Sequence, residues 1–344
     1  MKQKFLPILF CIWALVIFLS SGCARNVSPV SQTDFFFDTV ITITLYDTEN
    51  IGSKGCDEIL SSCFSLCETY EKMLSRTVKG SDIWNINHAA GTPVTVHPET
   101  ARLLKKSLYF CAQTDGLVDI TIAPVSDLWN FSSNNLLEMQ PHDIPSHTRL
   151  QSLLSHVDYH AVHVDGNLVT LADPEASIDL GCIAKGYIAD QLKAHLISQG
   201  ITSALINLGG NIQTIGSKPD GSAYMLGIQK PFDTAGTLIA TLPVTDASLV
   251  SSGIYERYFK AEDILYHHLL NSKTGMPVEN ELLGVTILAD SSADADVLST
   301  AAFLLGLDEG MEYIESFPDT EAVFITKDYE LHPSSGLSHI LQKQ

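Results

Sequence analysis

Residues 293–303 have the sequence ADADVLSTAAF, and residues 178–190 have the sequence IDLGCIAKGYIAD. Each segment places acidic or hydroxyl side chains at the start of an apolar, helix-like run, and helix N-termini favour anions such as phosphate. Asp296 and Thr300 are four residues apart, so they share one helical face. Carboxylate and hydroxyl oxygens are hard ligands that hold Mg²⁺ beside a phosphate. The pair therefore indicates chemistry on a phosphorylated ligand.

Structural roles for the same residues are the alternative at this point. Asp294 or Asp296 can serve as an N-cap or a first-turn acid, because Asp is among the favoured caps, and Thr300 can face the core. Lys185 places a cation near the start of a helix, where the helix dipole favours an acid. Such a lysine can neutralise a ligand phosphate or bind a ring carbonyl, or it can face solvent.

The N-terminus has the features of an export signal. Two lysines in residues 1–4 precede an apolar stretch, residues 5–19, and small residues lead to Cys23. We expect residues 1–22 to be a lipoprotein signal peptide, Cys23 to carry lipid and residues 23–34 to form a polar tether. A plain signal peptide cleaved nearby is the alternative. With the lipoprotein signal, we expect the protein to be exported and lipid-anchored to a bacterial membrane.

The rest of the chain is strongly acidic. The 344 residues have a formal charge of −20, and loss of the two signal-peptide lysines lowers it to −22. Nucleic acid binding needs basic surface, so we expect no nucleic acid partner. About 300 residues remain, enough for one large domain or two. Cys63 and Cys67 lie four apart on an apolar helical face and are predicted to be core residues.

The order of predicted elements favours an α+β fold, because strands and helices mix without regular alternation. A polar insertion is expected at residues 132–150. Helices are predicted at residues 56–74, 98–113, 183–199, 296–305 and 311–317. Strands are predicted at residues 37–46, 161–164, 168–171, 203–215, 224–229, 247–250, 266–270, 284–288 and 322–326.

Three further motifs are weak signals when each is taken alone. NLGGN at residues 207–211 fits a bulge, a tight turn or a close approach to a ligand, and SSGIYER at residues 251–257 combines hydroxyls with a glycine. His267 and His268 are adjacent, so only one of them can face a given site on a strand. The sequence contains no GxSxG, HExxH, GxGxxG or P-loop motif, which excludes the commonest hydrolase and nucleotide-binding classes.

Taken in order, these segments resemble the ApbE-type flavin transferases. The resemblance covers roughly residues 35 to 330 and rests on FDTVITITLY, GLVDITIAP, DLGCIAKGY, INLGGN, SSGIYERYF, HHLLNSKTGMPV and ADADVLSTAAFLLG. It implies an α+β domain of mixed sheets with packed helices over residues 35–335, ApbE-like and related to the T-fold. Such enzymes transfer FMN from FAD to a protein hydroxyl.

The resemblance also implies roles for individual residues. The side chains of Asp296 and Thr300, with the main-chain carbonyl of Cys182, are the expected Mg²⁺ ligands. His268 is the expected base, because the titration range of histidine suits proton transfer. The residues expected at or near FAD are Asp179, Lys185, Leu117, Val118, Asp119 and Leu270, with Phe37 and Thr77 standing where methionine and tyrosine are common.

One departure from the family pattern falls beside the expected base. The usual H-x-x-D-P is His268-Leu269-Leu270-Asn271-Ser272 here, so a carboxylate and a proline are missing.

The expected reaction moves FMN from FAD to a Ser or Thr hydroxyl of an exported or membrane redox protein and releases AMP. The expected acceptor carries a short Asp-x-x-Ser/Thr-Gly-Ala-Ser/Thr motif. Two alternatives are a Mg²⁺-dependent FAD pyrophosphatase and a lipoprotein that binds flavin without chemistry.

Overall fold

The computed structural model describes residues 28–49, 51–131 and 144–344. The expected signal peptide, Cys23 and most of the predicted insertion lie outside these ranges. Within them, no helix combines the length and the apolar character needed to cross a membrane.

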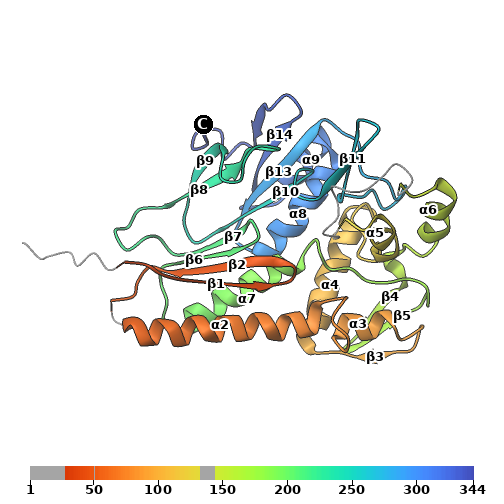
Figure 1. Cartoon of the computed structure of the whole chain (residues 1–344), viewed down its shortest axis with the longest axis horizontal. Coiled ribbons are helices and arrows are strands. Elements are labelled where there is room, and N and C mark those ends of the chain that lie inside the picture. Colours follow the sequence, from red (N-terminus) through yellow and green to blue (C-terminus); the bar gives the residue numbers. More distant parts are fainter. Residues whose placement is uncertain (1–27, 50, 132–143) are drawn as a thin grey trace, which may run out of the picture.

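An antiparallel sheet of eight strands forms the centre of the fold, in the order β1-β2-β6-β7-β10-β13-β14-β15. Every strand from β2 to β14 places apolar side chains in the core, and Figure 1 shows the sheet running across the molecule. The strands are β1 Val30–Phe36, β2 Thr39–Leu45, β6 Ala204–Leu208, β7 Asn211–Ile215, β10 Ser248–Gly253, β13 Leu282–Ala289, β14 Glu321–Thr326 and β15 Leu331–Pro333.

Four helices pack on this sheet (Figure 1). Helix α7, Ala184–Ser198, contacts β6 and β7, while α8, Ser292–Leu305, contacts β10 and β13. The two helices also pack against each other, so they bring the two segments quoted first in the sequence together. Helix α2, Gly52–Leu74, packs against β1. Helix α9, Leu307–Glu315, packs against β14.

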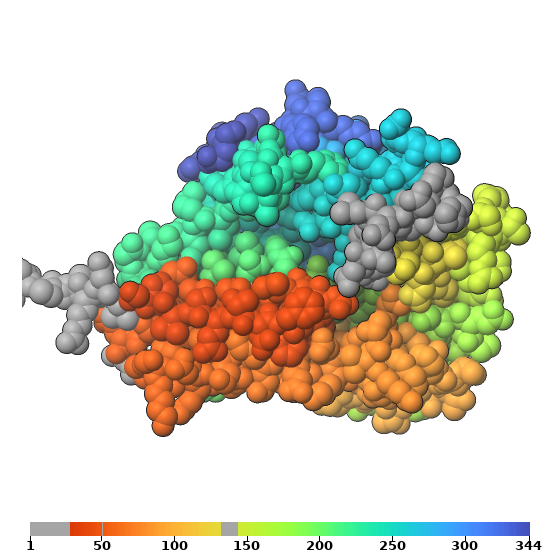
Figure 2. All heavy atoms as spheres, in the orientation of Figure 1, coloured from red at the N-terminus to blue at the C-terminus, as the bar shows by residue number. Residues whose placement is uncertain are grey.

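Smaller elements surround this core. Figure 2 shows the N-terminal hairpin and α2 as one continuous flank of the surface. The remaining helices are α3 Asp82–Asn87, α4 Pro98–Gln113, α5 Ala123–Trp129, α6 His147–Leu154 and the 3₁₀ turn Tyr159–Ala161. One three-stranded sheet consists of β3 Val94–Thr95, β4 Val162–Asp165 and β5 Leu168–Leu171. A second consists of β8 Tyr224–Gln229, β9 Leu238–Val244 and β16 Gln342–Lys343, and a separate hairpin is formed by β11 Tyr258–Ala261 and β12 Ile264–His267.

A second, smaller hydrophobic core lies apart from the main one. We call it the small core. It joins α5 and α6 to the β11–β12 hairpin, and its rings stack on one another, with Phe131 and Phe259 centroids 5.6 Å apart. Its buried members are Val125, Trp129, Phe131, Leu150, Phe259, Ala261 and Leu270.

The predicted α+β class is confirmed, and three elements have the predicted bounds: α4, β5 and β8. Cys63 and Cys67 are buried in the core, as expected. Helices α3 and α5 and strands β9 and β11 were not predicted. Helices α3 and α5 and strand β11 have only four to seven residues, too few for a clear periodicity, whereas the sequence of β9, LIATLPV, is apolar and was overlooked.

Several predicted boundaries are wrong. The tether was expected to extend to residue 34, but β1 begins at Val30 and pairs with β2 over its whole length. The single strand at residues 203–215 is a hairpin, because Gly209 and Gly210 adopt positive φ values of 59° and 95° and turn the chain. The strand at residues 266–270 ends at His267, and α6 begins inside the expected insertion.

The start of α8 corrects the reading of Asp296. The helix begins at Ser292, four residues before the predicted start, and Ser291 is the N-cap, accepting a hydrogen bond from the Asp294 amide. Asp296 therefore lies in the second turn, facing away from the capping position. Neither Asp294 nor Asp296 is the N-cap, but Asp294 is an acid in the first turn of α8, as the structural alternative had it.

Candidate active site

Helices α7 and α8 touch backbone to backbone at Gly186. A Cβ atom added there would lie 2.1 Å from the Ser292 carbonyl oxygen and 2.7 Å from the Ala293 Cα. Glycine is therefore required by close approach, since any side chain would force the helices apart. This contact brings the start of α7 beside Asp296.

Hydrogen bonds cross this contact in both directions. The Gly186 amide on α7 donates to Asp296 Oδ2 on α8 at 2.9 Å. In return, the amides of Ser292 and Ala293 donate to Asp190 on α7 at 2.8 and 3.0 Å, and the Ser291 hydroxyl adds a third bond at 3.0 Å. Asp190 thus satisfies free N–H groups at the start of α8. We call this arrangement the α7–α8 lock.

The lock leaves two oxygen atoms without hydrogen bonds from the described residues. Asp296 is only 3 % exposed, and its Oδ1 accepts no such bond. The Gly186 amide, which would normally close the first turn of α7 on the Cys182 carbonyl, binds Asp296 instead, and no other backbone amide among the described residues takes its place. Burial raises the pKa of the Cys182 thiol well above its ordinary value, so its side chain stays neutral.

Thr300 lies one turn after Asp296, beside strand β10. Its Oγ1 is 3.2 Å from Ser252 Oγ. Within the described residues, no three His, Cys, Asp or Glu side chains gather closely enough to hold a metal ion. Asp296, Thr300 and the Cys182 carbonyl form a different kind of set, made only of hard oxygen donors.

Burial raises the pKa of Asp296 above its ordinary value, while Lys185 and the Gly186 amide oppose this and the charge of Asp190 adds to it. Lys185 also lies within electrostatic range of Glu256 and His268. The structure therefore brings the expected lysine, the expected carboxylate and the expected base into one neighbourhood.

Asp179 lies on the approach to α7, held by an arginine that the sequence did not single out. Its Oδ2 is 3.1 Å from Arg76 Nε, and Arg76 Nη1 lies 2.5 Å from Asp127 Oδ1. Its Oδ1 accepts from the Gly181 amide at 2.8 Å. Thr77, next to Arg76, is exposed and contacts Ser75.

The segment at residues 117–119 is mostly turned inward. Asp119 is 8 % exposed, and its carboxylate accepts hydrogen bonds from the Thr121 amide and hydroxyl and from the Tyr159 amide. Val118 is buried as well, while Leu117 is half-buried. The carboxylate of Asp119 is thus occupied by hydrogen bonds within the protein, and Leu117 has the most accessible side chain of the three.

His268 differs in one respect from the expectation. Burial and the nearby Arg257 lower its pKa to about 3, so it does not titrate near neutral pH. Its Nδ1 lies 3.3 Å from the Arg257 carbonyl oxygen, which only accepts, so Nδ1 carries the proton. His268 is therefore neutral, and Nε2 presents a lone pair.

His267 is a core residue. Its Nε2 donates to the Val278 carbonyl at 3.1 Å, and its Nδ1 accepts from the Leu269 amide at 3.3 Å. Leu270 is 9 % exposed and belongs to the small core. Phe37 lies in the turn between β1 and β2, where its amide donates to Glu71 at 2.8 Å.

A model of the ApbE family matches residues 37–324. The chain belongs to the ApbE family. It is 35% identical over 283 residues to a FAD:protein FMN transferase of Klebsiella pneumoniae, covering 81% of this chain and 86% of that protein. A FAD:protein FMN transferase of Treponema pallidum is 29% identical over 334 residues, with 92% and 90% covered.

Solved structures of the family have the same fold. The ApbE protein of Thermotoga maritima superposes with a TM-score of 0.81 at 26% identity, covering 92% of this chain and 100% of that chain. The flavin transferase ApbE of Vibrio cholerae gives a TM-score of 0.80 at 25% identity, covering 91% and 99%.

The departure from the ApbE pattern at residues 271 and 272 has a structural explanation. Asn271 Oδ1 accepts from the amides of Lys273 and Thr274 at 2.8 and 3.3 Å, a role that a carboxylate oxygen also fills. The Ser272 hydroxyl donates to the Gly116 carbonyl, a bond that proline cannot make. The loop is therefore intact and is tied to the segment that precedes Leu117.

Sequence reasoning missed Arg76, Asp190 and Ser252 as parts of this site. Arg76 and Asp190 are single charged residues in ordinary surroundings, and only the tertiary contacts give them partners. Ser252 was seen in a motif whose contacts were unknown. The one available signal for Asp190 was its place as the seventh residue of a helix whose other face is apolar.

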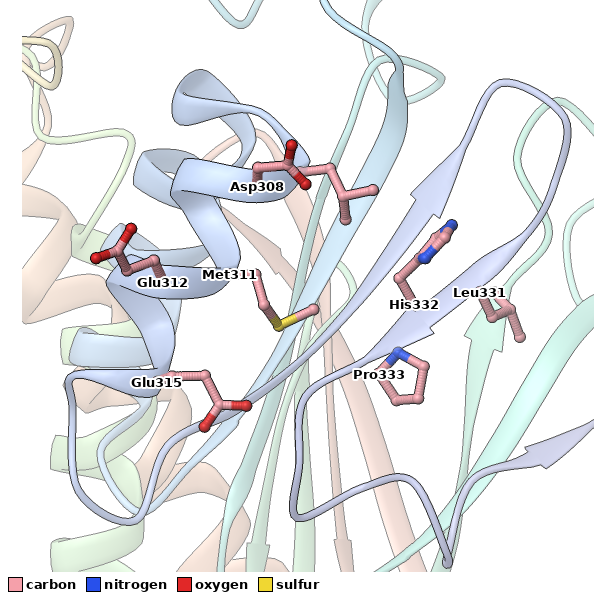
Figure 3. Close-up of a pocket in the computed structure, with 8 residues that line it drawn as sticks. Asp308, Met311, Glu312, Glu315, Leu331, His332 and Pro333 are labelled. Atoms are coloured by element: carbon pink, nitrogen blue, oxygen red, sulfur yellow. The ribbon is translucent and has the colours of Figure 1, made fainter.

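A surface hollow of about 560 Å³ lies elsewhere, between α9 and β15 (Figure 3). Figure 3 shows Met311 extending from α9 into the gap beside Pro333. Its lining residues are Leu307, Asp308, Met311, Glu312, Glu315, Leu331, His332 and Pro333, and none belongs to the expected site.

Proposed function

We propose that this chain is a FAD:protein FMN transferase, which moves FMN from FAD to a Ser or Thr hydroxyl of an exported or membrane redox protein and releases AMP. Membership of the ApbE family and the names of its relatives support the activity. The observation that carries the assignment to a site is the buried carboxylate of Asp296, whose Oδ1 accepts no hydrogen bond from the described residues and which lies one helical turn before Thr300.

These donors fit Mg²⁺. All three are hard oxygen atoms, and only one carries a charge, which suits a cation that shares its coordination with substrate phosphates. Asp296, Thr300 and the Cys182 carbonyl would hold it. When bound, Mg²⁺ supplies neutralisation of the charge that develops on the pyrophosphate oxygens.

The chain's own groups supply the rest of the chemistry. Lys185 adds a positive charge beside Asp296, where a pyrophosphate needs one. The acceptor oxygen forms a bond to the FMN phosphorus as the bond to the AMP oxygen breaks. The hydroxyl proton passes to Nε2 of neutral His268, and AMP leaves with the bridging oxygen. Burial and the nearby Arg257 lower the pKa of His268, which keeps its Nε2 free of a proton before the acceptor binds.

We also propose that the protein acts outside the cytoplasmic membrane, anchored by lipid on Cys23. The sequence of residues 1–23 supports this location. Replacement Cys23→Ala should move the protein from the membrane fraction to the soluble fraction of the producing cells. Retention of the variant in membranes would contradict the anchor.

The test of the activity is a mass measurement. The purified protein without its signal peptide is incubated with FAD, Mg²⁺ and an acceptor fragment that carries the expected hydroxyl motif. We expect the intact mass of the fragment to rise by one FMN residue, with one AMP released for each.

An unchanged fragment together with released AMP would identify a FAD pyrophosphatase instead. Bound FAD with neither product, across several acceptor fragments, would identify a flavin-binding protein. Either result contradicts the proposed transfer.

A further inference from the structure

Three hydroxyl groups form a chain that connects β10 to α8 at the proposed cation site. Ser252 Oγ lies 2.7 Å from Ser299 Oγ and 3.2 Å from Thr300 Oγ1. Ser299 Oγ in turn donates to the main-chain carbonyl of Asp296 at 2.9 Å. Ser299 and Asp296 are buried, so this chain is shielded from bulk water over most of its length.

The direction of each hydrogen bond follows from the number of protons, because every hydroxyl has only one. The Asp296 carbonyl oxygen can only accept, so Ser299 uses its proton there. The contact between Ser299 and Ser252 then requires Ser252 as the donor. With its own proton used, Ser252 can only accept from Thr300.

This sequence of donors and acceptors directs the Thr300 proton toward Ser252 and leaves a lone pair of Thr300 Oγ1 free for a cation. A hydroxyl binds a cation through a lone pair, so its proton must have another acceptor. We propose that Ser252 is a positioning residue that accepts a hydrogen bond from the Thr300 hydroxyl and so keeps a lone pair of Thr300 Oγ1 available to the cation. This inference rests on the proposed function, which places Mg²⁺ at Asp296 and Thr300.

Loss of Ser252 has a predictable consequence. A threonine inside a helix commonly turns its hydroxyl onto the carbonyl four residues earlier, which for Thr300 is that of Asp296. Ser252 offers a competing acceptor on the neighbouring strand. Without it, we expect the Thr300 hydroxyl to rotate toward its own helix and away from the cation.

The test measures Mn²⁺ binding to the full chain without its signal peptide, in the presence of FAD, from the electron paramagnetic resonance signal of free Mn²⁺. A blank with FAD alone is subtracted. We expect Ser252→Ala to raise the Kd for Mn²⁺ about 10-fold, the lower end of what loss of a group supporting a metal ligand costs. Ser252→Thr, which keeps the hydroxyl, should restore binding.

Two further variants separate positioning from general damage. Ser251→Ala is the matched control, because Ser251 is the adjacent residue of β10 and makes a similar hydroxyl contact, 2.8 Å to Thr286 Oγ1, away from α8. It should bind Mn²⁺ as the wild type does. In Ser299→Ala, Ser252 loses its acceptor and can turn its proton toward Thr300, where it competes with the cation for the Oγ1 lone pair. Ser252 can still accept from Thr300 in this variant, so the Kd for Mn²⁺ should rise by a smaller factor than in Ser252→Ala.

The outcomes distinguish this inference from the proposed function. Unchanged affinity in folded Ser252→Ala, or equal weakening in Ser251→Ala, overturns the role of Ser252 alone. If the wild type and Asp296→Asn bind Mn²⁺ equally, the proposed cation site fails, and the role of Ser252 fails with it. In transfer assays, Ser252→Ala should need about 10-fold more Mg²⁺ for half-maximal rate and regain most of its rate at saturation.

Discussion

The α7–α8 lock and the segment around His268 face the same site but are built differently. In the lock, two helix backbones touch at Gly186, and four hydrogen bonds between charged or backbone groups join α7 to the start of α8. His268 instead follows the β11–β12 hairpin, a two-stranded sheet that packs on the small core. Single bonds, such as that from Trp129 Nε1 to the Gly275 carbonyl at 2.7 Å, tie this region down.

The difference indicates a division of tasks. The proposed cation ligands need a fixed geometry, and the lock restrains Asp296 through its bond to the Gly186 amide and through the close packing of α7 on α8. The histidine needs a particular protonation state, and burial beside Arg257 provides that. We therefore expect changes in the lock to act on stability and metal affinity together. Changes near His267 and His268 should act on pH dependence.

The largest effect is expected from Gly186→Ala. The new Cβ would overlap backbone atoms of α8, which cannot yield as a flexible side chain can, so the variant should lose about 3 kcal/mol or more of unfolding free energy. Gly181→Ala is the matched control in the same motif, because its Cβ would meet only the Asp179 side chain, at 3.1 Å. Urea unfolding of both variants measures the contrast. Equal losses of unfolding free energy in the two variants would show that the close approach at Gly186 has no special role in stability.

A smaller effect is expected from Asp190→Asn. The substitution keeps the shape but removes a charge that accepts three hydrogen bonds at the start of α8, so it should cost about 2 kcal/mol. Asp47→Asn is a suitable control. Asp47 Oδ2 likewise accepts from the Thr202 amide and hydroxyl, both at 2.7 Å, but it is not part of the lock.

Stability and Mn²⁺ affinity should both fall in Asp190→Asn, whereas Asp47→Asn should lose only stability. If Asp190→Asn unfolds at lower urea concentration but binds Mn²⁺ as tightly as the wild type, the lock does not position Asp296.

On the other side of the comparison, His267 should make stability depend on pH. Burial lowers its pKa to about 4, so between pH 6.5 and about 4 the unfolded chain binds a proton that the folded chain does not. Unfolding free energy therefore falls as pH falls through this range, by up to about 1.4 kcal/mol per pH unit from this residue.

The measurement is the difference in unfolding free energy between wild type and His267→Gln at several pH values. Buried acids with raised pKa values, such as Asp190, act in the opposite sense in both proteins and cancel in the difference. The stability advantage of the wild type should shrink as the pH falls from 6.5 to about 4. A difference that stays constant over this range would show that His267 is not held neutral by the fold.

The smallest effect is expected from Asn271→Asp, which restores the carboxylate of the family pattern. A carboxylate oxygen can accept the same two amides, so stability should change by less than about 0.5 kcal/mol and transfer activity should stay within about twofold. A large gain in rate would mean that Asn271 limits catalysis and that the loop does more than hold its own turn.

The sequence alone predicted those site residues whose pattern lies within a few neighbouring positions. The four-residue spacing of Asp296 and Thr300 predicted a shared helical face, and both lie on α8, Asp296 at the contact with α7 and Thr300 beside β10. It misplaced the helix start, because Ser291 caps as well as Asp does and only the backbone shows which one is used.

Other parts of the site depend on contacts between distant segments. The three bonds that Asp190 accepts join residues about 100 positions apart in the chain, so no periodicity shows them. The pKa of His268 was expected to be ordinary, because burial and the approach of Arg257 are tertiary properties. The Gly209-Gly210 turn was left open as a bulge, a turn or a ligand contact, and strand pairing shows a hairpin turn.

The central claim is the position of the cation, and a crystal structure with FAD and Mn²⁺ tests it most directly. We expect an anomalous scattering peak in contact with Asp296 Oδ1, Thr300 Oγ1 and the Cys182 carbonyl oxygen, at about 2.0–2.2 Å from each and beside the FAD pyrophosphate. A peak elsewhere, for example in the acidic hollow beside α9, or FAD bound with no metal between Asp296 and its phosphates, would contradict the account.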